Sequence, residues 1–471
     1  MKVLFINPPF EPADSVGESR SVRFVLNITP PLGLAYLGAV LERKGEEVKI
    51  VDYTGRHPYL PLPRLLEEFH PDIIGITATT PSFASALRIA RRCRDLLPRA
   101  KLVLGGAHVT ADPDGTMAGC EFDIAVRGEG EETFSEMLDQ IGKSGPGKLS
   151  SCRGIIYREG NGYEKTGERP FISELDSLPF PAYHLLPPLS AYHPTPASYR
   201  RLPVGILITS RGCPHQCTFC DRAVFGNRTR FHSPERVASD VEKLVKKHGA
   251  REIRFFDDAF TLNRERTLAI CEKLRKLELN LLWTCLTTAS SVDLEMLKEM
   301  KKAGCWQVLY GIESGDERML KSLKKGNTVE INRRAVRWAK EAGLEVRGDF
   351  IVGTPGETME SLENTLRFAR EEGLDYAHFN KFVPFPGTEL YRRLLKEDYS
   401  FDFSQGCSIL DHGALLYVPE SLTPEQYRRW LDRAFKKFYL RPSYILKRLL
   451  SIRTWPQLKG QLRGAVSILG L

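Results

Sequence analysis

Three cysteines lie close together in one short segment, and their spacing suits iron. Cys213, Cys217 and Cys220 are separated by three and then by two residues. Three thiolates on one loop can bind three irons of a cubane cluster, and the fourth iron then keeps an open position. An open iron implies a ligand that comes from a substrate or a cofactor. A zinc knuckle with a distant fourth ligand, or three unrelated cysteines, is the alternative.

The elements that position this motif are six strand candidates, each followed by a helical pattern. The cysteines come directly after the first strand, and six units are fewer than the eight that close a full barrel. We therefore expect an α/β fold with a partial (β/α)6 barrel, open on one side, over residues 204–395. The strands are expected near 205–209, 252–256, 281–286, 307–311, 346–352 and 376–382.

The first 145 residues show a second α/β pattern. Short apolar runs alternate with helical stretches, which is typical of a doubly wound domain with a parallel sheet. Ligands of such sheets bind beyond the carboxyl ends of the strands, so the small and polar residues of those loops should line one crevice. The strands are expected at 3–7, 47–52, 72–77, 101–104 and 122–126.

Two segments of different amino-acid composition complete the chain. Residues 146–203 are rich in proline, which discourages regular helix, and are predicted to be an ordered linker. Residues 396–471 are predicted to be a C-terminal region with basic amphipathic helices. From Glu425 onward there are eleven Lys or Arg and two acidic residues, so the net charge of +8 belongs to this tail.

Composition and the N-terminus bound the class of protein. The chain has 471 residues, of which 42% are hydrophobic and 27% charged, and this excludes a disordered or collagen-like protein. We find neither a secretory signal nor a run of about 18 apolar residues. Ten cysteines are too few for a disulfide scaffold in a chain of this length. We therefore expect a cytoplasmic protein.

At the cysteine motif the sequence resembles the radical S-adenosylmethionine (SAM) enzymes, whose hallmark is C-x3-C-x2-C after the first strand of a partial (β/α)6 barrel. The resemblance implies that the three cysteines hold a 4Fe–4S cluster, that its open iron chelates SAM, and that one electron cleaves SAM to a 5′-deoxyadenosyl radical. The usual Gly-Gly-Glu after the second strand is replaced here by two aspartates. Packing or helix capping is the alternative for each further contact. The implied SAM contacts are Phe219 and Gly353 near the adenine, Asp257 or Asp258 at the ammonium, and Glu313 and Ser314 at the ribose.

The first domain resembles the cobalamin-binding domain that precedes the barrel in the cobalamin-dependent radical SAM class. The matching segments are Asn7-Pro8-Pro9, residues 30–37, Gly75-Ile76-Thr77, Gly105-Gly106-Ala107-His108 and Arg127-Gly128-Glu129-Gly130-Glu131. The D-x-H-x-x-G signature of a cobalt-ligating histidine is absent, so His108 is expected to hydrogen-bond corrin amides or the phosphate. A domain of this fold that has lost cobalamin is the alternative. The implied contacts are Asn7, Pro8, Thr77, Ser82, Gly105, Gly106, His108 and Gly130.

Together the resemblances imply a methyltransferase that acts on an unactivated carbon, or less readily on a phosphinate. Methylcobalamin would form from one SAM, and the radical from a second SAM would activate the substrate. One alternative is an anaerobic oxidative cyclase or rearrangement enzyme that uses cobalamin without methyl transfer. Another is a noncatalytic iron–sulfur or cobalamin-binding protein. The barrel-mouth candidates for substrate-side catalysis are Tyr310, Asn380 and Lys381.

The expected partners are a small-molecule substrate and an external electron donor such as flavodoxin or ferredoxin. Aromatic and aliphatic residues recur at helical spacing between Tyr427 and Tyr439, with Lys and Arg around the rest of the wheel. Such a helix either packs over the open side of the barrel or lies on an anionic membrane surface. The second possibility would favour a hydrophobic or lipid-like substrate. Nucleic acid is not expected, because no recognised binding motif accompanies the charge.

Overall fold

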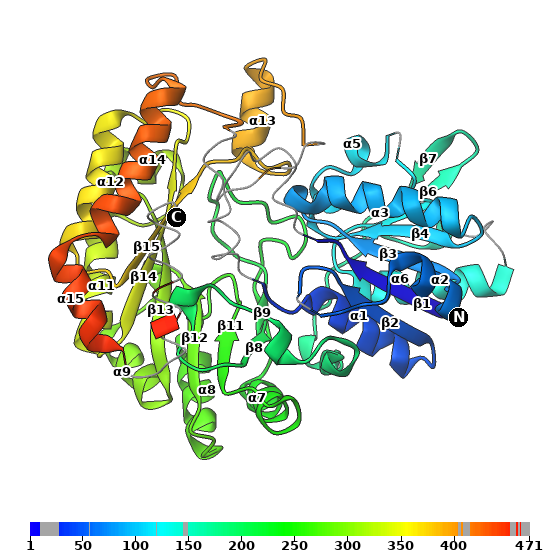
Figure 1. Cartoon of the computed structure of the whole chain (residues 1–471), viewed down its shortest axis with the longest axis horizontal. Helices are drawn as coiled ribbons and strands as arrows, with labels where there is room; N and C mark the ends of the chain where they lie inside the picture. The colour runs from blue at the N-terminus through cyan, green and yellow to red at the C-terminus, as the bar shows by residue number, and fades with distance from the viewer. Residues whose placement is uncertain are drawn as a thin grey trace.

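The computed structural model places two α/β parts of the chain side by side, each built on its own sheet (Figure 1). It describes residues 1–9, 28–55, 57–118, 120–144, 149–403, 407, 415–452, 458–459 and 462. The predicted domain boundary at 145/146 and most of the predicted tail beyond residue 452 lie outside the described residues. The α/β class that the alternating pattern predicts is confirmed.

The first sheet has seven strands in the order β2-β1-β3-β4-β5-β6-β7. The five strands predicted from the apolar runs pair in parallel, while β6 and β7 run antiparallel at one edge. The strands are β1 (Lys2–Asn7), β2 (Glu47–Asp52), β3 (Ile73–Thr77), β4 (Lys101–Gly105), β5 (Ile124–Val126), β6 (Ile155–Glu159) and β7 (Gly162–Lys165). The helices are α1 (Leu32–Arg43), α2 (Leu62–Phe69), α3 (Phe83–Leu96), α4 (Ala107–Ala111), α5 (Pro113–Met117) and α6 (Gly130–Ser144).

The hairpin of β6 and β7 lies within the segment predicted to be a linker. Residues 155–165 contain no proline, so their backbone groups are free to pair with β5. The linker prediction is therefore wrong for these two strands. The proline-rich remainder forms short turns, and Tyr183 anchors it by donating a hydrogen bond from its hydroxyl to the carbonyl of Ile206 in the first barrel strand.

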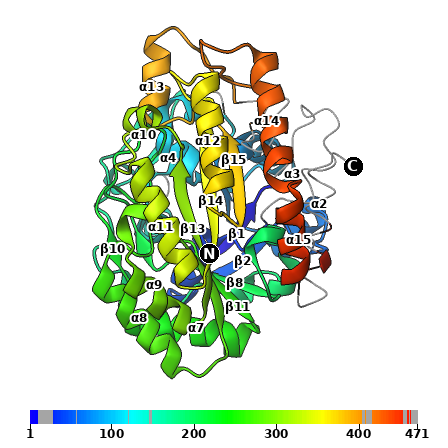
Figure 2. The ribbon, with the colours of Figure 1, turned by 90° about the vertical axis from the view of Figure 1, so that its left-hand side faces the viewer.

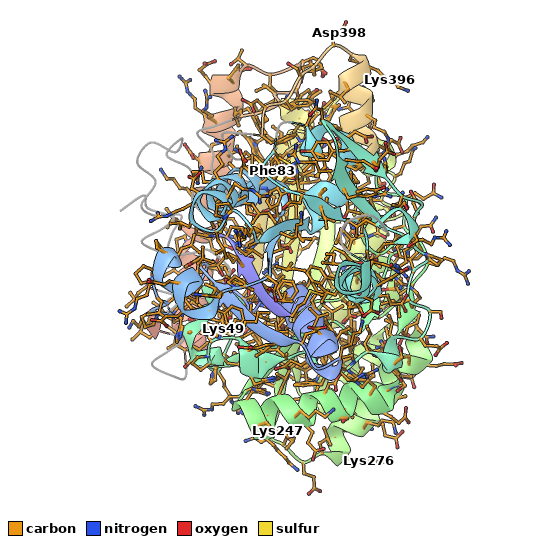
Figure 3. The ribbon with its side chains drawn as sticks, turned by 90° about the vertical axis from the view of Figure 1, so that its right-hand side faces the viewer. Lys49, Phe83, Lys247, Lys276, Lys396 and Asp398 are labelled. Atoms are coloured by element: carbon orange, nitrogen blue, oxygen red, sulfur yellow. The ribbon has the colours of Figure 1, made fainter. Side chains whose placement is uncertain are left out.

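The second sheet has six parallel strands in the order β8-β11-β12-β13-β14-β15. No pairing joins β8 to β15 among the described residues, so the barrel is partial, as predicted. The strands are β8 (Val204–Leu207), β11 (Glu252–Phe255), β12 (Leu282–Thr287), β13 (Cys305–Glu313), β14 (Glu345–Val352) and β15 (Tyr376–Lys381), and a small ribbon pairs β9 (Ser210–Arg211) with β10 (Arg230–Phe231). The helices are α7 (Pro234–His248), α8 (Arg264–Lys276), α9 (Leu294–Lys302), α10 (Glu317–Ser322), α11 (Val329–Glu341), α12 (Met359–Glu371) and α13 (Glu389–Lys396). Helices α7 and α8 run along the outer edge of the molecule, where Lys247 and Lys276 are labelled in Figure 3.

Successive residues of the barrel strands face opposite sides of the sheet. Phe255, Val346 and Phe379 belong to the apolar core beneath the helices. Their neighbours, which include Arg254 of β11 and Arg347 of β14, therefore face the lumen of the barrel. This alternation decides which of the candidate residues can reach a ligand.

Two tail helices, α14 (Pro424–Tyr439) and α15 (Pro442–Ser451), cover the outside of the barrel. Helix α14 lies beside α12 and β15 (Figure 2) and buries its apolar face there. Trp430 and Phe438 of α14 contact the ring of Phe379 in β15. The aromatic residues on which the membrane prediction rested are thus packed against protein. In the part of the chain that the structure describes, no helix is long and apolar enough to cross a bilayer.

Candidate functional site

The cysteine loop runs between β9 and β10 and is held by its backbone. Gly212, which precedes Cys213, has a φ of 90°, and a side chain there would collide with the carbonyl oxygen of Arg228. Farther along, the N–H of Thr218 donates a hydrogen bond of 3.0 Å to the carbonyl of Leu323. The loop therefore keeps its shape without using the thiols.

The three thiols share a desolvated environment and repel one another when they are ionised. Burial raises the pKa of all three thiols, that of Cys220 to about 12, and the repulsion of Cys217 and Cys213 adds to the rise at Cys220. Among the described residues, no three His, Cys, Asp or Glu side chains converge on one point where a metal ion would sit. The thiolates of a cubane bind separate irons, and the irons stabilise their charge.

The two aspartates after β11 differ in what holds them. The buried carboxylate of Asp257 accepts hydrogen bonds from the N–H and hydroxyl of Thr209 at 2.9 and 3.0 Å, and from the hydroxyl of Ser210 at 2.5 Å. Asp257 thereby fixes the turn that leads into the cysteine loop. The charge of Asp258 instead raises the pKa of the Cys213 and Cys220 thiols. Asp258 is therefore the aspartate that faces the cluster position.

A buried ion pair stands on the other side of the cysteines. Glu313 lies at a bulge in β13 with a φ of 64°, a backbone conformation that costs a non-glycine residue about 1–3 kcal/mol. Its carboxylate accepts a hydrogen bond of 2.7 Å from Nζ of Lys325. The charge of Lys325 opposes the pKa rise of Cys213 and Cys217, so it lies beside both. Sequence reasoning misses Lys325, because it ends a lysine-rich run that is typical of a solvated surface.

The other predicted SAM contacts interact with neighbouring residues of the protein. The hydroxyl of Ser314 is buried 3.1 Å from that of Thr365. Gly353 has a φ of 82° and lies against the hydroxyl of Tyr427 in α14. The ring of Phe219 packs against a small apolar cluster around β15 and α13. These three residues therefore contribute to the structure around the site.

The three barrel-mouth candidates point in different directions. Tyr310 is 0% exposed in the core beneath the helices, so its prediction as a substrate-side residue is wrong. Tyr310 and Gly311 are neighbours in β13 and therefore face opposite sides of the sheet. The position of Tyr310 in the sequence does not say which of the two sides is the core. Asn380 is half-buried and faces the lumen. Lys381 is buried and follows it on the opposite face of β15.

A cavity opens at the carboxyl ends of the strands of the first sheet. Its volume is about 850 Å³ including its open mouth, and its lining is mostly apolar. Four predicted cobalamin contacts, Thr77, Gly105, Gly106 and Gly130, lie in that lining. A side chain at Gly105 would meet no atom within 4 Å and would project into the space, while Gly106 has a φ of 105°. The glycines thus keep open a cradle for a bulky group.

The other four predicted cobalamin contacts lie outside the lining of this cavity. Asn7 donates a hydrogen bond of 2.9 Å to an aspartate of β2, Pro8 is buried, and Ser82 caps a short helical turn. The ring of His108 contacts that of Phe83 of α3, which Figure 3 labels, in a tilted arrangement with 4.1 Å between ring centroids. Burial lowers the pKa of His108 to about 4, so the ring is neutral at physiological pH.

A buried ion network joins this cavity to the cysteine loop. Arg211, immediately before Gly212, donates from Nη1 to Glu129 at 2.8 Å and from Nη2 to Glu131 at 2.5 Å. Arg230 of β10 also pairs with Glu129, at 2.8 Å. Arg211, Glu129 and Glu131 all line the cavity. The two candidate cofactor sites are therefore adjacent and share one set of charges.

Comparison with known families finds two matches on this chain. The family model of the radical SAM superfamily matches residues 207–369, which include the cysteine loop. The model of the B12 binding domain matches residues 22–138, which include most of the residues of the first domain that line the cavity.

Whole-chain relatives agree with this combination. An uncharacterized methyltransferase of Pyrococcus horikoshii is 36% identical over 95% of this chain and 94% of its own. The anaerobic magnesium-protoporphyrin IX monomethyl ester cyclase of Rubrivivax gelatinosus is 30% identical over 93% of this chain and 79% of its own. Among solved structures, the radical SAM methyltransferase TsrM of Kitasatospora setae has a TM-score of 0.72 at 17% identity, covering 100% of this chain and 98% of that one. That structure holds cobalamin and a 4Fe–4S cluster and supports the fold.

Proposed function

Because the chain belongs to the cobalamin-dependent radical SAM enzymes, we propose that it transfers a methyl group from SAM to a carbon that has no lone pair, or less readily to a phosphinate. The observation that carries this proposal is the position of the cavity. Its lining includes Arg211, just before the cysteines, and Phe225, just after them. A methyl carrier in the cavity would therefore lie next to SAM on the cluster, as a methyl transfer requires.

When bound, the cluster supplies an electron, SAM supplies the methyl and adenosyl groups, and cobalamin carries the methyl between them. The chain contributes positions and charges. We propose that Cys213, Cys217 and Cys220 hold the cluster and that the carboxylate of Asp258 binds the ammonium of SAM. Glu313 and Lys325 supply one acceptor and one cation at the same site. Because the side chain of Lys325 is only 11% exposed, water screens its charge little.

The test is to measure SAM products from the anaerobically reconstituted protein with cobalamin and a strong reductant, without substrate. A methyltransferase should form about one equivalent of S-adenosylhomocysteine per bound cobalamin, because cobalt accepts a methyl group. The Cys217→Ala control lacks the cluster that holds SAM and supplies the electron, so it should lose 5′-deoxyadenosine and form less S-adenosylhomocysteine. Absence of S-adenosylhomocysteine from the wild type would contradict the proposal.

An anaerobic oxidative cyclase is the second candidate, because the relative that is 30% identical bears that name. It predicts 5′-deoxyadenosine alone, lost in Cys217→Ala. A noncatalytic protein predicts neither product.

We infer that flavodoxin or ferredoxin delivers the electron, in the reducing cytoplasm. What supports this is that Cys220 is the most exposed residue of the three, although its thiol itself is desolvated. We also keep peripheral membrane contact as a proposal for α15, whose Leu446, Leu449 and Leu450 are exposed. Sedimentation with anionic vesicles, compared with a Leu446→Ser/Leu449→Ser/Leu450→Ser variant, tests it.

A further inference from the structure

The lumen of the barrel contains a buried arginine that forms no ion pair among the residues that the structure describes. Arg254 of β11 is 3% exposed. Among the described residues, no group accepts a hydrogen bond from its Nε or Nη1. Its guanidinium carbon lies 4.5 Å from the ring centroid of Phe256, two residues nearer the carboxyl end of the strand. The charge is therefore directed up the lumen, toward the end where the cysteine loop lies.

The acidic side chains nearest to Arg254 bond other groups. Asp349 accepts a hydrogen bond of 2.7 Å from Arg347 through Oδ2, while its Oδ1 stands 3.4 Å from Nδ1 of His378 and has no hydrogen-bond partner among the described residues. Glu252, one layer below, accepts hydrogen bonds from two backbone N–H groups and from the indole of Trp306. A buried cation without a partner costs several kcal/mol. Folding alone gives no reason to keep it.

Two arginines face one aspartate in this layer, and burial raises the pKa of Glu252 below it to about 7, so the net charge stays positive. Burial and repulsion by Arg347 lower the pKa of Arg254 to about 9, so the group remains charged at neutral pH. Burial and the nearby arginines lower the pKa of His378 to about 4, so the ring is neutral there. The unbalanced charge is thus present under the conditions in which the protein works.

Arg254 forms the floor of an open upper lumen. Directly above it, the lumen-facing side chains are only half-buried, and they are Phe256, Leu286, Ile351, His378 and Asn380. Below it the lumen is closed by the linker. The amide of Gln307 donates a hydrogen bond of 3.1 Å to the carbonyl of Ala197, and Arg347 donates one of 3.1 Å to the hydroxyl of Ser198. A ligand must therefore enter from the cofactor end.

We propose that Arg254, assisted by Arg347, binds an anionic group of the substrate, a carboxylate or a phosphate, at the floor of the barrel. The ring and aliphatic chains of Phe256, Leu286 and Ile351 then contact an apolar part of the same molecule. The substrate is an amphipathic anion that enters the barrel with its charged end first. This inference rests on the proposed function only in that it takes the barrel mouth to be the reaction site.

The test is calorimetric titration of the cluster- and cobalamin-loaded protein with octanoate and octyl phosphate, with octanol and octylamine as matched neutral and cationic probes. At least one anion should bind at least tenfold more tightly than octanol, and the stronger of the two identifies the anionic group. Charged hydrogen bonds are worth about 1.5–3 kcal/mol, so Arg254→Gln should weaken that anion about ten- to hundredfold. Arg200→Gln removes an arginine that pairs with Glu345 near the bottom of the barrel, and should leave binding unchanged.

Unchanged binding of the anions in Arg254→Gln, equal binding of octanol, or no saturable binding of either anion would each overturn the inference. The melting temperature separates binding from a structural role: removing an unpaired buried charge should leave it equal or higher, and a drop would contradict the argument. Arg254→Lys, which keeps the charge, should restore part of the affinity. S-adenosylhomocysteine measured in the same preparation tests the proposed function separately, because anion binding does not require methyl transfer.

Discussion

Replacing Arg211 by methionine tests whether the buried network holds the two domains together. The side chains of Arg211, Glu129 and Glu131 are 5%, 3% and 7% exposed, so solvent does not screen their charges. In the variant, Glu129 keeps Arg230 and the N–H of Ile172, but Glu131 loses its ionic partner. Removing one partner of a buried pair costs about 3–5 kcal/mol, because a buried charge is left uncompensated. We expect Arg211→Met to lose that much free energy of unfolding.

The assay is urea unfolding of the cofactor-free protein under reductant, followed by circular dichroism. Arg264→Met is the matched control, since Arg264 also bridges two acidic residues, Asp293 and Glu295, but is 45% exposed. It should change stability by about 0–1 kcal/mol. The double variant Arg211→Met/Glu131→Leu removes the orphaned carboxylate and should recover most of the loss. A single variant within about 1 kcal/mol of the wild type, or a double variant no better than the single, would refute the reasoning.

Three further outcomes are expected. Because the pKa of His108 falls from 6.5 to about 4 on folding, the unfolded chain binds the proton first as the pH drops. Between pH 7 and pH 5 this residue should therefore cost about 2 kcal/mol of stability. Urea titrations of His108→Leu should show a shallower dependence of stability on pH. Gly353→Ala should destabilise by about 1–2 kcal/mol from its backbone and further from collision with Tyr427, whereas Gly356→Ala, with a φ of 81° and no atom within 4 Å, should show the backbone cost alone in the same unfolding assay; equal losses would contradict the clash. Lys325→Met should lower the iron and sulfide content after reconstitution, since it removes the cation beside the cysteines, and Lys325→Arg should retain more; equal content in both would contradict that role.

Much of the architecture could be predicted because its signals are local. Strand periodicity and the cysteine spacing can be recognised without knowledge of the fold, and both sheets follow from them. The predictions that were wrong or incomplete depend on which face of a strand a residue occupies. Tyr310 lies in the core, and of the adjacent Asp257 and Asp258 only the second faces the cysteines, since neighbours on a chain point to different sides.

Longer-range pairing was also beyond the sequence. Lys325 forms an ion pair with Glu313, although α10 separates the two residues in the sequence. Nothing in a run of lysines identifies the one whose side chain is largely buried. The hairpin β6–β7 joins the first sheet although its surroundings are rich in proline, because pairing depends only on the residues that pair. Arg254 carries no motif at all. Its environment became informative only when the neighbouring strands showed that, among the described residues, no group accepts a hydrogen bond from its Nε or Nη1.

The two buried arginines illustrate how charge balance separates structure from ligand binding. Arg211 donates to two carboxylates of the chain itself, so its charge is balanced by the protein. Such a site gains nothing from an added anion, which would meet Glu129 and Glu131 and be repelled. Arg254 has the opposite balance, with a second arginine nearby and, among the described residues, no acceptor for its Nε or Nη1. An anion there would offset a repulsion that the folded chain otherwise retains. If the proposal holds, adding the anion that binds more tightly, octanoate or octyl phosphate, should therefore raise the melting temperature of the wild type and not that of Arg254→Gln.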